Sequence, residues 1–176
     1  MLAASTFDLA FRILHIMFGV AWAGSAFLFT VFIEPAAAKL GPDAGPVMEE
    51  LVDRRKIGEI VTGISAVTVI AGWVLWTGDM LLAPSLGDWL RSSFGLILTI
   101  GGIAATGALF AGIVGIPPNI KRLSALGKEV AASGGPPTPE QQADMHSIQE
   151  RMRMLSRVDL ALIAIAVFCM ATARYW

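Results

Sequence analysis

Long apolar windows alternate with charged segments along this chain, and the pattern predicts four membrane-spanning helices. A helix needs roughly 20 mostly apolar residues to cross the hydrocarbon core of a bilayer. The windows that reach this length lie at about 9–33, 57–78, 93–116 and 157–174. We therefore predict an all-α, integral membrane four-helix up-and-down bundle, which forms one domain over residues 1–176.

The segments between the spans carry turn and helix-start signals. After a Gly- and Pro-rich turn, residues 47–56 are typical of a short amphipathic helix. The Pro-Pro pair at 117–118 predicts an interruption, followed by a second short helix over 119–132. Thr138 and Pro139 form a helix-start signal, and no helix breaker follows. We expect the fourth span to extend backwards as a charged cytoplasmic stalk, which packs on 47–56 or on a partner.

Composition agrees with a protein of the bilayer. Of the 176 residues, 55% are hydrophobic and only 15% are charged, and the mean hydropathy is +0.67. Soluble domains average about 25% charged residues, so an ordinary soluble enzyme and a disordered chain are both disfavoured. The net charge of −1 gives no case for nucleic acid as a partner.

The distribution of lysine and arginine predicts the orientation. Ten of the thirteen lie in or beside the segments 34–56 and 117–156. Because positive residues favour the cytoplasmic side, we expect both termini on the outer, periplasmic side of a bacterial inner (plasma) membrane. Trp73, Trp76 and Trp89 are then expected at the outer boundary, as in an aromatic belt.

Small residues indicate where helices approach each other. In lipid, apolar side chains gain little from meeting one another, so close packing relies on small residues. The third span is especially rich in glycine. We expect it to lie centrally or against a partner subunit, through Gly95, Gly101, Gly102, Gly107, Gly112 and Gly115.

His15 is the first candidate for chemistry, because an ionisable group within a span is a functional hypothesis. Arg12 precedes it, and Gly19 and Trp22 follow it, at spacings of three and four, so they share its face. Gly19 would leave clearance for a flat ligand such as haem b or another tetrapyrrole, with His15 as axial ligand. The alternative is a structural histidine that is hydrogen-bonded to a neighbouring helix.

A second ligand would have to come from another residue type. The other histidine, His146, belongs to the stalk, across a core of about 30 Å, so the two cannot share an iron within one chain. Met170 and Cys169 are expected at the same outer depth as His15. With His15 they would suit His/Met ligation of haem or binding of Cu(I), and core packing is the alternative.

Charged residues also gather at the inner ends of the spans. We expect them to form a structural layer of ion pairs, with a proton or quinone site as the functional alternative. The residues concerned are Glu34, Glu59, Arg151, Arg153 and Asp159.

One stretch carries a family resemblance. The run Arg12-Ile13-Leu14-His15-Ile16 is followed by Trp22-Ala23-Gly24 and by Glu34-Pro35. It resembles the first helix of the copper-resistance protein D family and its integral-membrane relatives, and more distantly that of the HemJ-type protoporphyrinogen oxidases. The resemblance implies a helical membrane protein whose first-helix histidine contacts haem or a metal.

Three functions stay open. The first is a redox- or tetrapyrrole-associated membrane protein that uses His15. The second is a noncatalytic accessory subunit without a cofactor, in a homo-oligomer or a larger membrane complex. The third is a copper-handling protein that uses His15, Met170 and Cys169. No phosphate-binding loop or nucleophile–base motif points to a particular enzyme.

Overall fold

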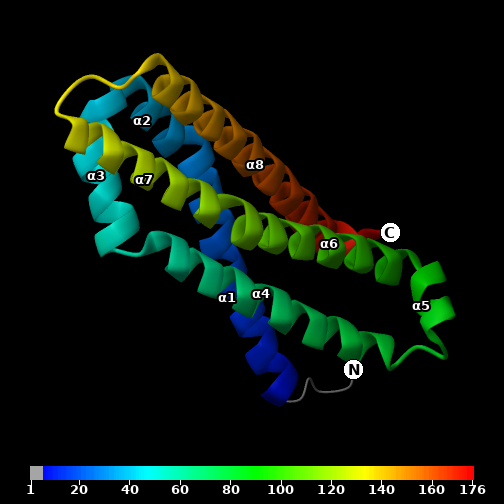
Figure 1. Cartoon of the computed structure of the whole chain (residues 1–176). Helices are drawn as coiled ribbons and strands as arrows, with labels where there is room; N and C mark the ends of the chain where they lie inside the picture. The colour runs from blue at the N-terminus through cyan, green and yellow to red at the C-terminus, as the bar shows by residue number, and fades with distance from the viewer. Residues whose placement is uncertain (1–5) are drawn as a thin grey trace.

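The computed structural model describes residues 6–176, and this part of the chain is helical with short connections and no strand (Figure 1). Residues 1–5, which belong to the expected single domain, lie outside the described range. The α-helices are α1 (Thr6–Leu28), α2 (Glu34–Leu40), α3 (Gly45–Glu49), α4 (Ile57–Met80), α5 (Leu86–Arg91), α6 (Ser93–Phe110), α7 (Ile116–Ser133) and α8 (Pro139–Thr172). Short π-helical turns cover Phe29–Ile33, Glu50–Arg54 and Ala111–Gly115, and 3₁₀ turns cover Gly41–Ala44 and Ala173–Tyr175.

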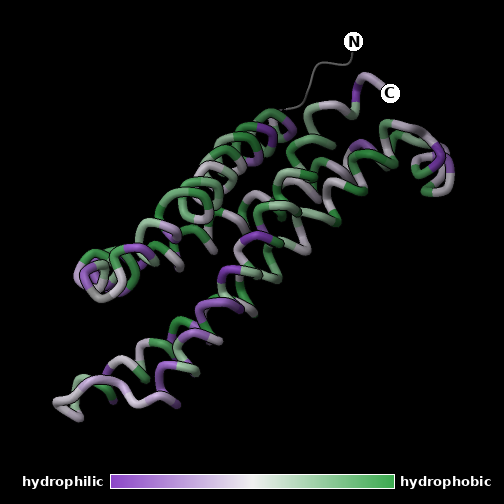
Figure 2. Tube along the Cα trace, turned by 90° about the horizontal axis from the view of Figure 1, so that it is seen from above, coloured by the Kyte–Doolittle hydropathy of each residue, from purple (hydrophilic) through white to green (hydrophobic). Residues whose placement is uncertain are grey.

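Four continuous helical segments are long and apolar enough to cross a membrane. They run over Thr6–Leu40, Ile57–Met80, Ser93–Ser133 and Pro139–Tyr175. Hydrophobic positions follow the long helices in Figure 2, whereas the connection between α7 and α8 and the adjoining half of α8 are hydrophilic. The all-α class and the four long apolar helices are thus confirmed.

The first and third of these segments continue through their prolines. A π-helical turn precedes Pro35, and another precedes Pro117 and Pro118. Proline lacks an N–H and crowds the preceding turn, and a local π adjustment accommodates this without ending the helix. The predicted interruption at 117–118 is therefore wrong, since α6 runs into α7 without a loop. Helical structure likewise extends past Glu34 to Leu40.

The predicted long final helix is confirmed. The Thr138 side chain accepts a hydrogen bond from the Gln141 N–H, and the Gln141 side chain accepts one from the Thr138 N–H. This capping box starts a helix of 34 residues. We expected 47–56 or a partner to cover its hydrophilic half, but α7 lies along it, with Arg122 3.7 Å from Asp144.

The core of the bundle takes one residue from each long helix. Trp22 of α1, Val69 of α4, Ala108 of α6 and Ile163 of α8 are buried together. α1 packs most extensively on α4, and α6 packs most extensively on α8. The centre of the molecule is therefore filled by side chains.

The glycines of α6 face both neighbouring helices. Gly101 lies against Cys169 and Met170 of α8, and Gly102 lies against the Trp73 ring of α4. A Cβ on Gly101 would lie 2.9 Å from the Cβ of Cys169, and a Cβ on Gly102 would lie 3.3 Å from the Trp73 ring. α6 therefore packs on α4 and α8 at these two glycines, whereas a Cβ on Gly112 would meet nothing within 4 Å.

Candidate functional site

His15 is held by the backbone of α4. Its Nδ1 lies 2.8 Å from the carbonyl oxygen of Thr68. A carbonyl oxygen only accepts hydrogen bonds, so Nδ1 is the donor, and in the neutral form of the ring Nε2 keeps the lone pair. The hydrogen bond to a neighbouring helix that the structural alternative predicts is therefore present, and Nε2 is the ring nitrogen left as a potential ligand atom.

Two glycines make the approach of α1 to α4 possible. A Cβ on Gly72 would lie 2.8 Å from Cε1 and 3.0 Å from Nδ1 of His15, so the imidazole rests on the bare backbone of that residue. Gly19 faces α4 as well, and a Cβ there would lie 3.4 Å from the Thr68 methyl group. The space beside Gly19 thus faces the Thr68 methyl group, and the prediction that Gly19 leaves clearance for a flat ligand is wrong, because α4 packs there.

Charged groups lie beside the contact between α1 and α4, toward the start of α1. The Arg12 guanidinium and the Asp8 carboxylate both act electrostatically on Asp79, in the last turn of α4. Because Arg12 lies one turn before His15, the imidazole and the guanidinium form one polar stripe on α1. Asp79 is an acidic neighbour of that stripe on α4.

The other predicted site residues lie elsewhere in the bundle. Trp22, with 6% of its surface exposed, belongs to the central core. Cys169 is buried, and it packs with Met170 on Gly101 of α6, whereas the contacts of His15 are with α4. Within residues 6–176, no three His, Cys, Asp or Glu side chains converge as a metal site.

The expected tryptophan cluster is present. Trp73, Trp76, Trp89 and Phe94 form a row of edge-to-face contacts, with successive ring centroids 5.3, 6.2 and 5.7 Å apart. The Nε1–H of Trp73 donates to the Thr106 hydroxyl at 2.9 Å, and that of Trp76 donates to the Thr99 hydroxyl at 2.8 Å. These bonds join α4 to α6 and satisfy indole groups that would otherwise be unpaired.

At the opposite end of the long helices, the expected ion-pair layer forms in part. Arg153 lies 3.9 Å from Glu34 and 3.2 Å from Glu150. Glu59 pairs with Lys56 of its own segment instead, at 3.8 Å. No ion pair joins Arg151 or Asp159 to another residue of the described range.

The partners of His15 on α4, Thr68 and Gly72, were not predicted from the sequence. Ser65, Thr68 and Gly72 follow one another at spacings of three and four, so they share one face of α4. Ser65 and Thr68 are both buried. This stripe of small residues in the second span was the available signal, because small residues mark close helix contacts in membranes.

No protein-family model matches the chain, and searches of curated proteins and of solved structures gave no match either. The resemblance of the first helix to the copper-resistance protein D family thus stays a prediction. The proposals below rest on the chain's own geometry.

Proposed function

We propose that the protein is a multi-pass membrane protein whose four spans form an up-and-down bundle, with both termini on the outer side. Four long apolar helices support the insertion. The orientation is supported by the concentration of lysine and arginine in the segments expected on the cytoplasmic side. It places His15 near the outer boundary and the α7–α8 connection in the cytoplasm.

Within this bundle, we propose that His15 binds a tetrapyrrole, with haem b as the expected ligand, through Nε2. The observation that carries the proposal is the hydrogen bond from Nδ1 to the Thr68 carbonyl. Histidines that ligate metals commonly donate their other ring N–H to a carbonyl or carboxylate, which fixes the ring and raises its basicity. Haem held by one imidazole supplies one-electron chemistry.

The neighbouring residues have defined roles in this proposal. Gly72 permits the imidazole to lie close against α4, and the hydrogen bond to the Thr68 carbonyl fixes the orientation of the ring. Arg12, one turn nearer the boundary, offers a cation to a carboxylate of the tetrapyrrole. His146 lies on the hydrophilic half of α8, which the proposed orientation places outside the spans, so His15 is the histidine of a span.

Copper binding receives less support from the geometry. Cu(I) requires soft ligands that converge on one point. Cys169 and Met170 contact α6, whereas His15 contacts α4. We therefore prefer a tetrapyrrole to copper.

The test is the absorption spectrum of gently solubilised protein, expressed with haem precursor in excess, before and after reduction with dithionite. We expect a Soret band and a reduced α band in the wild type and in His146→Ala, and neither band in His15→Ala. The His146 variant is the matched control, because it removes the other histidine and leaves the contact between α1 and α4 intact. A blank spectrum from folded wild-type protein would refute the tetrapyrrole proposal and favour the accessory-subunit alternative.

A further inference from the structure

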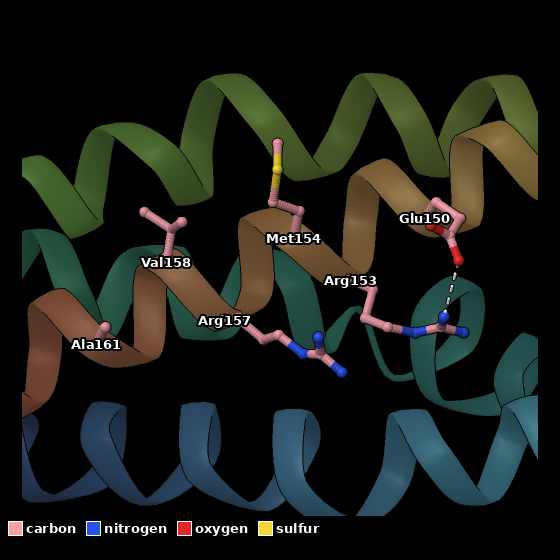
Figure 3. Close-up of a pocket in the computed structure, with 6 residues that line it drawn as sticks. All are labelled: Glu150, Arg153, Met154, Arg157, Val158 and Ala161. Carbon is pink, nitrogen blue, oxygen red and sulfur yellow. Dashed lines mark hydrogen bonds and ion pairs between the residues drawn. The ribbon is translucent and has the colours of Figure 1, made fainter.

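Two arginines lie one turn apart on α8, where its hydrophilic half meets its apolar half. Figure 3 shows Arg153 and Arg157 extending in the same direction, toward the ribbon of the first long helix. A pocket of about 280 Å³ is lined by Thr30, Glu34, Pro35, Ala38 and both arginines. A second pocket, of about 370 Å³, is lined by the same arginines with Glu150, Met154, Val158 and Ala161.

The charges of the two arginines are balanced differently. Arg153 has carboxylate neighbours on two sides, at 3.9 Å in Glu34 and 3.2 Å in Glu150. Within residues 6–176, no carboxylate comes within ion-pair distance of Arg157, and Glu34 acts on it only at longer range. The Arg157 guanidinium is therefore available to an anion from outside the chain.

The position of Arg157 along α8 indicates the kind of anion. From Leu160 to Ala173 the helix carries no charged residue, so Arg157 is the last cation before the apolar span. A guanidinium at this point lies at the level of the lipid headgroups. Val158 and Ala161, which line the larger pocket, continue from there toward the hydrocarbon core.

We propose that these two pockets bind an anionic phospholipid, with the headgroup phosphate on Arg157 and an acyl chain along Val158 and Ala161. The planar guanidinium can donate two parallel hydrogen bonds to one phosphate. Basic pockets between membrane helices on the cytoplasmic side are typical sites for anionic headgroups. The proposal rests on the membrane placement given above but is independent of any ligand at His15.

The experiment is a titration of the full chain in detergent with phosphatidylglycerol, and in parallel with phosphatidylcholine, followed by native mass spectrometry. Arg157→Gln should bind phosphatidylglycerol at least about tenfold more weakly, since charge-assisted hydrogen bonds are lost. The affinity of Arg157→Lys for phosphatidylglycerol should fall between those of the wild type and Arg157→Gln. Lysine keeps the charge but lacks the planar guanidinium. Arg151→Gln is the matched control: it removes the same charge from α8 at an exposed position that lines neither pocket.

Several results would overturn the lipid site. These are equal affinity for the two lipids in the wild type, equal affinity of wild type and Arg157→Gln for phosphatidylglycerol, or an equal loss in Arg151→Gln. Displacement of the lipid by millimolar inorganic phosphate would identify a free-anion site instead. If Arg157→Gln does not fold, as judged by its thermal melt in phosphatidylcholine, the affinity of Arg157→Lys for phosphatidylglycerol is compared with that of the wild type instead. Release of the chain from membranes by carbonate would contradict the membrane placement itself, so the two failures are distinguishable.

Discussion

Replacement of Gly72 by alanine tests whether His15 is pinned between α1 and α4. The added Cβ would lie 2.8 Å from the imidazole Cε1, closer than a Cβ normally approaches another atom. The ring must then swing aside and lose its hydrogen bond to Thr68, or α1 must move away from α4. Gly63→Ala is the matched control, because it lies on the same helix and a Cβ there would meet nothing within 4 Å.

The expected change in the free energy of unfolding of Gly72→Ala is the sum of opposing contributions. Alanine gains about 1 kcal/mol over glycine in a helix, and this gain is common to both variants. A hydrogen bond between membrane helices contributes about 0.6 kcal/mol on average and about 1.7 kcal/mol at most. Residual crowding adds to the cost when the ring cannot move freely. We therefore expect Gly72→Ala to be about 1–2 kcal/mol less stable than Gly63→Ala.

The assay is unfolding in mixed detergent micelles with increasing SDS, followed by circular dichroism. Both alanine substitutions are also made in a His15→Ala background, where the clash no longer exists. There the two variants should agree within about 0.3–0.5 kcal/mol, as expected for sites that do not interact. The pinned position of His15 would be refuted if Gly72→Ala and Gly63→Ala were equally stable with His15 present, or if their difference persisted without it.

Further substitutions test other contacts, each by the same unfolding assay. Trp73→Phe and Thr106→Val should each destabilise the protein by about 0.5–1.5 kcal/mol, because each removes the same hydrogen bond. The double variant should then be destabilised by less than the sum of the two single variants. Additive destabilisation would contradict the hydrogen bond between them. Gly101→Ala should lower the stability by about 1–3 kcal/mol through crowding against α8. Gly112→Ala, where the added Cβ would meet nothing within 4 Å, should not lower it. Equal stability of the two variants would refute the close contact. Thr138→Ala should cost about 0.5–2 kcal/mol by removing the cap of α8, with Thr138→Ser as the variant that retains stability.

Much of the fold could be predicted from the sequence, because hydropathy and helix caps act locally. The four apolar windows become four long helices, and Thr138 starts the last of them as predicted. The glycines of the third span mark a helix packed on two neighbours. The prolines at 117–118 led to the wrong expectation of an interruption. A π-helical turn accommodates them, so the helix continues through them.

The candidate site was harder to predict, because it depends on which helix faces meet. Depth along the membrane normal placed Met170 and Cys169 level with His15, but depth does not determine the direction in which a side chain points. The structure turns both toward Gly101 of α6, and it turns His15 toward Thr68 of α4. The partner of the imidazole is a backbone carbonyl, and the small residues Ser65, Thr68 and Gly72 along this face of α4 were the sequence signal that could have found it.

The most direct test of His15 as a ligand is a haem b titration of solubilised, cofactor-free protein, monitored as the Soret difference spectrum. The wild type and His146→Ala should saturate at one haem per chain, with a band distinct from that of haem in detergent alone. His15→Ala should give only the spectrum of free haem. Saturable binding of His15→Ala with the same spectrum as the wild type would contradict the role assigned to His15.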